Sequence, residues 1–452
     1  MISLKTLLEN IGSRATPGST SNKDAYRLIA AMSVIDRCVF SVEDTPDLPD
    51  PALNKGRLAY VNADADYYVS NGEAWVSDFS SVYEVLDSVL HTVGSNNVGA
   101  LGNDESNLIL RSSPTMVDGA ITDWTDVSAG RFHALALSTA SGLLAWGQGT
   151  DGRLGDGGVL NRSSPVSVAG ALTGWTSVSC GLEHSCGVAS GVLWSWGSNY
   201  NGCLGHDDVL NKSSPVSVVG GFTDWVEVSC GGSITIARRT DNTAWTWGHN
   251  TYGSLGHDDV LPKSSPVSVV GGFTTWSKVS AGEYSCGGIL ADGTLWAWGK
   301  NSYGQLGHDD VLPKSSPVSV VGGFTDWEDL SVGWYSMLGK RTNNTLWAWG
   351  WNSDGQLGDG AAANKSSPVS VIGGFTDWAF IECNFYNCLG TRTDGSLWTW
   401  GLNSHGQLGH NDIISKSSPV SVNGGFVHWE SGALARNFGM FRGFEYKGFV
   451  DP

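Results

Sequence analysis

Seven copies of one phrase, Ser-Ser-Pro followed by a short apolar strand, recur along this chain. The copies begin at spacings of 51, 50, 51, 51, 51 and 51 residues, at Ser112, Ser163, Ser213, Ser264, Ser315, Ser366 and Ser417. A tryptophan recurs in step, at Trp124, Trp175, Trp225, Trp276, Trp327, Trp378 and Trp429. A repeat of about 50 residues that is rich in glycine and tryptophan is typical of a β-propeller with one blade per repeat. The sequence therefore predicts a mainly β fold of seven blades.

Each repeat divides into four short strands. In one copy we expect strands at 276–280, 285–290, 295–299 and 316–320, with tight turns or a loop between them. The proline at the start of the last strand indicates an outermost position, because a sheet edge needs no N–H there. Four antiparallel strands per repeat make one blade.

The two ends of the repeat array are incomplete in complementary ways. The segment Leu90–Gly94 stands where other repeats have Leu-Trp-x-Trp-Gly, so this piece lacks the first two strands of a blade. The last segment that begins with the repeated tryptophan, 429–449, lacks the last strands of a blade. We expect the two pieces to form one blade together, which closes the ring and leaves no free sheet edge.

Residues 1–80 do not repeat and predict a small α+β module. Leu4, Leu7, Leu8 and Ile11 have helical spacing, and a second helix is expected over 22–35. Strands expected at 58–61, 67–69 and 74–76 indicate a three-stranded meander. The predicted organisation is thus the module at 1–80, a linker at 81–89, helical in one interpretation, and the propeller at 90–452.

Composition and charge exclude several classes of partner. The net charge is −18, whereas binding to nucleic acid or an anionic membrane needs clustered Lys and Arg. The sequence contains no run of 18 apolar residues, so it predicts no membrane-spanning helix. The first ten residues lack the features of a signal peptide. The eight cysteines contain no Cys-x-x-Cys pair. We interpret them as buried small residues, which favours free thiols, a reducing compartment and no metal site.

The repeat pattern resembles a known family. Leu-Trp-x-Trp-Gly, Asn-x-x-Gly-x-Leu-Gly-His, Ser-Ser-Pro and Asp-Trp-x-x-Val-Ser-x-Gly follow one another in the repeat, as in the regulator of chromosome condensation family. The resemblance covers residues 90–449 and implies a seven-bladed propeller. A plant photoreceptor of that family carries Gly-Trp-Arg-His-Thr segments, but here Gly333-Trp334 continues with Tyr335-Ser336, so light sensing is not expected.

Most tryptophans hold repeat-locked positions, which indicates packing of blade against blade. The candidate packing residues are the Trp-x-Trp pairs Trp194, Trp196, Trp245, Trp247, Trp296, Trp298, Trp347, Trp349, Trp398 and Trp400. Gly-His-Asp-Asp turns such as Gly205–Asp208 resemble metal-ligand clusters, but an Asp that caps a turn is the simpler interpretation. The basic residue before each Ser-Ser-Pro is expected to neutralise these turns.

The sequence contains no catalytic constellation. There is no nucleophile elbow or phosphate-binding loop, and His133 and His184 occupy a repeat position that suits structural hydrogen bonds. We therefore expect no enzyme activity and no cofactor. The residues that break the repeat are more informative, because unrepeated aromatics in exposed loops are typical of a recognition surface. The candidate binding residues are Trp334, Tyr335, Trp351, Tyr284, Tyr303, Phe385 and Tyr386.

Two functions from different classes remain at this point. The segment Asp66–Val76 resembles one common in bacteriophage tail fibres and other virion proteins, which implies a virion structural protein assembled in the host cytoplasm. Residues 1–80 would then contact other virion proteins, in multiple copies, and the propeller would bind a host-surface glycan or protein. The alternative is an intracellular protein–protein interaction scaffold with the same propeller.

Overall fold

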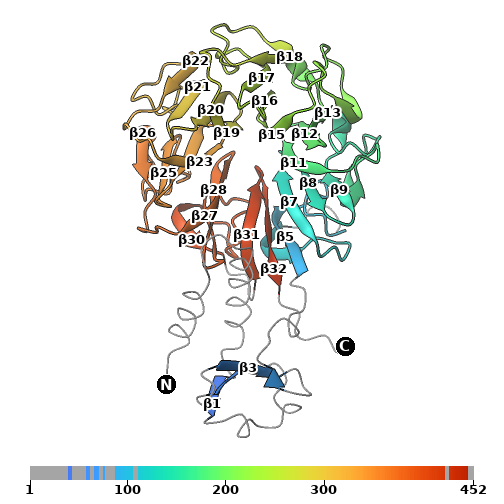
Figure 1. The fold of residues 1–452 in the computed structure, drawn as a ribbon, viewed down its shortest axis with the longest axis vertical. Helices are drawn as coiled ribbons and strands as arrows, with labels where there is room; N and C mark the ends of the chain where they lie inside the picture. Colours follow the sequence, from blue (N-terminus) through green and yellow to red (C-terminus); the bar gives the residue numbers. More distant parts are fainter. Residues whose placement is uncertain are drawn as a thin grey trace. The chain divides into compact units, whose positions relative to one another are not determined.

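The computed structural model is a ring of seven four-stranded antiparallel sheets (Figure 1). It describes residues 87–104, 110–422 and 427–445, together with the backbone of four short strands nearer the amino terminus. The predicted seven-bladed propeller is confirmed. No helix within these residues is long and apolar enough to cross a bilayer.

The strands take the same four places in every blade. The innermost strands are β7 (Trp124–Ala129), β11 (Trp175–Cys180), β15 (Trp225–Cys230), β19 (Trp276–Ala281), β23 (Trp327–Val332), β27 (Trp378–Asn384) and β31 (Val427–Leu434). The second strands are β8 (His133–Ser138), β12 (His184–Ala189), β16 (Ile234–Arg239), β20 (Ser285–Leu290), β24 (Ser336–Arg341), β28 (Asn387–Arg392) and β32 (Phe438–Glu445). The third strands are β9 (Gly142–Gly147), β13 (Val192–Gly197), β17 (Ala244–Gly248), β21 (Leu295–Gly299), β25 (Leu346–Gly350), β29 (Leu397–Gly401) and β5 (Asp87–Ser95). The outermost strands are β10 (Arg162–Ser167), β14 (Lys212–Ser217), β18 (Lys263–Ser268), β22 (Lys314–Ser319), β26 (Lys365–Ser370), β30 (Lys416–Ser421) and β6 (Leu110–Met116).

Blades 1 to 6 follow the chain from β7 to β30, and blade 7 closes the ring. Its strand order is β31-β32-β5-β6, so the carboxyl-terminal segment supplies the two inner strands and the amino-terminal segment the two outer ones. The Ser95 N–H donates to the Asn437 carbonyl at 2.8 Å across this junction. The predicted closure is confirmed. β5 begins at Asp87, earlier than the predicted propeller start at residue 90, so the end of the predicted linker is strand.

Tryptophans hold adjacent blades together, as expected. In each Trp-x-Trp pair the second ring is fully buried and the first is half-buried. Trp196 of blade 2, for example, shares a core with Leu135 and Leu143 of blade 1 and lies 6.2 Å from Trp175, ring centre to ring centre. Removing a buried indole of this kind costs about 3–5 kcal/mol. The hydrophobic core is therefore a series of layers between blades.

The loop after each third strand comes close to the tryptophan of the next blade. Gly307 has φ of +69°, and a Cβ at this position would lie 2.9 Å from Nε1 of Trp349. Both the left-handed backbone and the missing side chain are needed here. Two such loops, in blades 1 and 2, contain the short 3-10 helices η4 (Thr150–Gly152) and η5 (Tyr200–Gly202). This explains why Leu-Gly recurs in every loop of this kind.

The amino-terminal strands form a sheet of their own in a second compact unit. The sheet order is β1 (Val39–Val42), β2 (Leu58–Val61), β3 (Asp66–Ser70) and β4 (Trp75–Val76). β2, β3 and β4 coincide with the strands of the expected meander. β1 pairs in parallel with β2 and was not expected. The expected helices at 4–11 and 22–35 lie outside the described residues, as does the linker before Asp87.

Candidate functional site

The aromatic side chains of the loops lie on one face of the propeller. They come from the loop after the innermost strand and the loop after the third strand of a blade. These loops are joined within each blade, since the Lys300 N–H donates to the Tyr284 carbonyl at 2.9 Å and the Trp351 N–H to the Tyr335 carbonyl at 2.7 Å. Both loop sets therefore point to the same side of the ring.

The structure brings all seven predicted binding residues together. Trp334 is central, with ring centres 4.6 Å from Phe385, 5.6 Å from Tyr386 and 5.9 Å from Tyr335. Tyr303 lies 4.4 Å from Trp351 and 5.2 Å from Tyr335. We call this the aromatic cluster, which spans blades 3 to 6 and consists of Tyr252, Tyr284, Tyr303, Trp334, Tyr335, Trp351, Phe385 and Tyr386.

The expectation that these rings are exposed is wrong. Phe385 is only 2% exposed, and the other rings of the cluster are half-buried. The reason is that the two loop sets lie against each other and against the next blade, so each ring covers its neighbour. A sequence shows that a loop side chain is aromatic, but not which other loop packs on it. The cluster is a partly covered, pre-formed surface.

A lysine and a glutamate complete the cluster, and neither was predicted. The Lys300 Nζ lies 5.0 Å from the ring centre of Tyr252, 4.9 Å from that of Tyr284 and 5.0 Å from that of Tyr335. Three π faces around one ammonium make favourable cation–π contacts. Glu283, which is 8% exposed, lies beside the same tyrosines. Neither residue type is distinctive in a sequence, so only the packing of the loops reveals them.

The pKa values of Glu283, Tyr284 and Tyr335 favour uncharged tyrosine phenols beside the carboxyl group of Glu283. Burial raises the pKa of Glu283, although hydrogen bonds from Tyr284 and Tyr335 oppose this rise. Burial, followed by the nearby Glu283, raises the pKa of Tyr284 to about 12 and raises that of Tyr335 further. Both phenols therefore keep their protons at neutral pH and donate to the carboxyl group.

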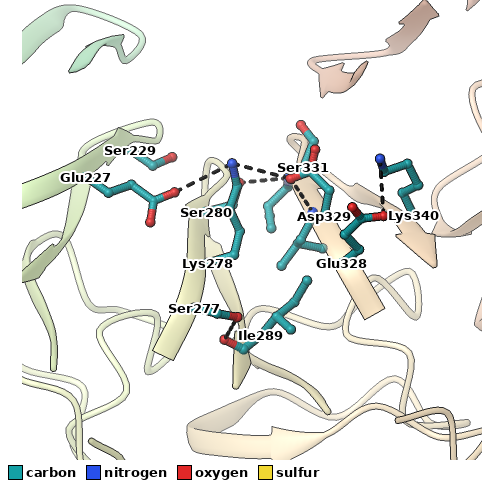
Figure 2. A network of polar contacts seen from close by, with 12 residues as sticks. Glu227, Ser229, Ser277, Lys278, Ser280, Ile289, Glu328, Asp329, Ser331 and Lys340 are labelled. Carbon is teal, nitrogen blue, oxygen red and sulfur yellow. Dashed lines mark hydrogen bonds and ion pairs between the residues drawn. The ribbon is translucent and has the colours of Figure 1, made fainter. Parts of the chain in front are cut away.

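The central channel opens at the same face. Its cavity, of about 250 Å³, is lined by the innermost strands, and Glu283, Trp334 and Phe385 lie at its mouth. Lys278 is held inside between two acids, with its Nζ 3.6 Å from Oε1 of Glu227 and 3.3 Å from Oδ1 of Asp329 (Figure 2). The channel wall is therefore polar and largely paired on this side.

A ladder of serines joins the innermost strands around the channel. Each serine Oγ accepts a hydrogen bond of 2.8–3.0 Å from a backbone N–H of the next blade. The pairs are Ser128 with Cys180, Ser179 with Cys230, Ser229 with Ala281, Ser280 with Val332, and Ser331 with Cys383. Glu382 takes the serine's place in blade 6 and accepts from the Leu434 N–H at 3.0 Å. Burial raises the pKa of Glu382 to about 8 and that of Asp126 to about 6.

The acidic turns and repeated histidines are structural, as expected. Asp208 accepts a hydrogen bond from the Leu210 N–H at 2.9 Å, which caps the turn. In blades 1 to 6 the basic residue before Ser-Ser-Pro pairs with an aspartate of the turn at 2.6 to 3.7 Å. His133 Nε2 lies 2.9 Å from Ser185 Oγ, and His184 Nε2 lies 3.1 Å from Thr235 Oγ1.

The structure places together one group of possible metal ligands that the spacing of cysteines in the sequence did not predict. The side-chain nitrogen and sulfur atoms of His184, Cys186 and Cys230 lie within 4.8 Å of one another, in the core between blades 2 and 3. Burial, followed by interaction with Cys230, raises the pKa of Cys186. Burial opposes ionisation of Cys230 as well, but Cys186 and His184 lower the pKa of this thiol. All seven described cysteines are buried free thiols, as expected.

Comparison with known proteins identifies the family. A family model described as an RCC1-like domain matches residues 89–439. The ultraviolet-B receptor UVR8 of Arabidopsis thaliana is 30% identical over 306 residues, which cover 66% of this chain and 69% of the receptor. This chain belongs to the RCC1-like propeller family.

Solved structures of low sequence identity show the same fold. Prp20p of Saccharomyces cerevisiae has a TM-score of 0.72 at 16% identity, with 82% of this chain and 94% of that chain covered. Human WBSCR16 has a TM-score of 0.71 at 19% identity, with 80% and 100% covered. These likenesses concern the fold alone. None of these similarities supports the predicted bacteriophage attachment module, and they favour the alternative of an interaction scaffold.

Proposed function

We propose that this chain is a protein-interaction module, which binds a partner protein through the aromatic cluster and the channel mouth. One observation carries the proposal: eight aromatic rings from loops, outside the Asp-Trp and Trp-x-Trp positions, gather on one face from four consecutive blades. Aromatic residues dominate the energetics of protein interfaces, and rings already held by their neighbours lose little conformational entropy on binding. The proposal assigns binding to this face and no catalysis.

The relatives support this class of function. Prp20p is described as binding Gsp1p and histones, and a second solved structure is of yeast RCC1 bound to Kap60. For this chain the net charge of −18 argues against a nucleic-acid partner. UVR8 is a receptor for ultraviolet-B by name. We do not extend light reception to this chain, because Gly333-Trp334 lacks the Arg-His-Thr continuation.

Photo-crosslinking around the cluster tests the proposal. A photoreactive amino acid would replace Ser302 or Ser353, which are exposed loop positions beside Tyr303 and Trp351. Tyr200, which is 70% exposed, occupies the same loop position in blade 2, away from the cluster, and serves as the matched control. All three proteins would be illuminated in an extract of the source cells.

We expect Ser302 and Ser353 to crosslink to the same partner protein, identified by mass spectrometry, and Tyr200 to give none of it. The triple variant W334A/Y335A/W351A, with the photoreactive residue kept at Ser302, should lose the crosslink. Equal labelling from all three positions, or a crosslink that survives the triple variant, would show that the cluster is not the binding surface.

A further inference from the structure

Two residues of one strand and one residue of the next blade meet in the core between blades 2 and 3. His184 and Cys186 are two apart on β12, so both side chains lie on the same face of the sheet. Cys230 ends β15 on the facing blade. The three residues are 1%, 0% and 7% exposed. One imidazole and two thiols thus meet in the buried core, with ligand atoms within 4.8 Å of one another.

We propose that His184, Cys186 and Cys230 form a structural site for a thiophilic closed-shell cation, Zn²⁺ or Cu⁺. Thiolate and imidazole are the ligands that both ions select, at about 2.0–2.3 Å for zinc. Atoms bound to one ion at these distances lie less than 4.8 Å apart. The three observed ligand atoms, which lie within 4.8 Å of one another, therefore need to move together only slightly to bind an ion. Binding releases the two thiol protons to solvent. Two thiolates with Zn²⁺ leave no net charge in the core, where charge is costly.

The hydrogen bonds around His184 suit a metal ligand. The Thr235 hydroxyl donates its proton to the Cys203 carbonyl at 2.8 Å, so its oxygen accepts from Nε2–H of His184 at 3.1 Å. This assigns the proton to Nε2 and leaves Nδ1 with a lone pair. Ligating histidines in metal sites characteristically donate their other ring N–H in this way. The Cys230 backbone is held as well, by its N–H bond to Ser179 Oγ at 2.9 Å.

The two neighbouring blade junctions lack this combination. The junction before it has His133 and Cys180 at the matching positions, but Leu135 replaces the middle cysteine. The junction after it has Ile234, Ile236 and Ala281. Within the described ranges, His184, Cys186 and Cys230 are the one such group of metal-ligating side chains. Cys186 therefore departs from the repeat, since four other copies have an aliphatic residue at its position, namely Leu135, Ile236, Leu338 and Leu389.

Metal content of the full-length protein tests the site. The protein would be produced in medium supplemented with Zn²⁺ or, in a second arm, with copper under reducing conditions, so that the ion is present while the chain folds. We expect about one ion of zinc or copper per purified chain by elemental analysis. C186S and C230S should each lose it. C286S, which removes a buried thiol in blade 4, should keep it.

A spectroscopic readout covers the case in which a serine variant does not fold. Protein produced with Co²⁺ should show a thiolate-to-cobalt charge-transfer band in the wild type and in C286S. Wild-type protein that holds none of the three ions would overturn the proposal. So would folded C186S or C230S, judged by tryptophan fluorescence, with the same metal content as wild type. Loss confined to C186S and C230S supports it.

Discussion

The ring centres of Trp334 and Phe385 lie 4.6 Å apart, with the planes tilted by 44°. Trp334 follows the innermost strand of blade 5, and Phe385 occupies the equivalent loop in blade 6. The pair therefore links two adjacent blades at the mouth of the channel. The candidate binding surface and the blade packing share these rings, so changes to the cluster affect stability as well as recognition.

We expect Trp334→Ala to lower the free energy of unfolding by about 2 kcal/mol. This is less than the roughly 3–5 kcal/mol for a fully buried indole, because Trp334 is half-buried. Denaturant unfolding would measure the change, and Tyr200→Ala, at an exposed ring outside the cluster, should alter stability by less than about 0.5 kcal/mol. Equal stability of W334A and the wild type would mean that the rings touch without holding the loops together.

Alanine substitution of two glycines, in the loops after β21 and β22, distinguishes the cost of backbone strain from the cost of steric contact. Gly307 and Gly323 have nearly the same φ, +69° and +67°, but a Cβ added at Gly307 would lie 2.9 Å from the Trp349 ring, whereas one added at Gly323 would meet nothing within 4 Å. Gly323→Ala should cost about 1 kcal/mol from the left-handed backbone. Gly307→Ala should cost at least about 1 kcal/mol more, because the indole must shift. Equal thermal melting of the two variants would contradict this role of the close approach.

The sequence predicts the propeller well because the motifs that define a blade recur at a constant spacing. Repeated spacing, Trp-x-Trp pairs and outer-strand prolines each depend on residues close together in the chain. Ring closure follows from the same logic, since the fragments at Leu90 and Trp429 are complementary. β1 was not expected, because four residues paired in parallel carry little local pattern.

The candidate site was only partly predictable for a related reason. Most of the aromatic cluster was predicted because its members are loop aromatics that only some blades carry, but their burial depends on contacts between loops of different blades. Lys300 and Glu283 are ordinary residues in the sequence. His184 and Cys230 lie on strands of different blades, so no spacing rule for metal ligands applies to them.

Lys278 should stabilise the channel by pairing with two acids. Lys278→Met removes the ammonium between Glu227 and Asp329 and leaves two carboxylates facing each other (Figure 2). We expect a loss of about 1 kcal/mol, modest because the lysine side chain is partly exposed. The double variant K278M/D329N, which leaves the ion pair of Glu227 with Arg238 intact, should recover most of this loss in denaturant unfolding. A double variant less stable than K278M would contradict the pairing argument.

Glu382 should make the protein less stable as the pH rises. Burial raises the folded-state pKa from its ordinary 4.5 to about 8. The folded state thus holds a proton that the unfolded state has lost, so stability is fully present below about pH 4.5 and falls until the pH passes about 8. Glu382→Ser introduces the residue that blades 1 to 5 have at this position. Its stability advantage over wild type should grow between pH 5 and 8, by at most about 1.4 kcal/mol per pH unit. A pH-independent difference in urea unfolding would refute the assignment.

Blade 7 should be the point at which the ring opens. Removal of residues 429–452 deletes β32 and most of β31, and with them the strand that pairs with β5. It also removes Phe438 and Met440 from the core that contains Leu90 and Trp146. The truncated chain would expose an unpaired edge and an apolar face, so we expect aggregation in size-exclusion chromatography.

A peptide that spans residues 427–445 supplies the matched control for this truncation. Added during refolding, it contains both missing strands and should restore a soluble monomer, because the lost pairing and core contacts re-form without a covalent link. A peptide with Phe438 and Met440 replaced by Ser should fail, since it restores the backbone pairing but not the apolar contacts. A truncated chain that stays monomeric and melts cooperatively without the peptide would show that the first six blades form a stable fold and that closure contributes little.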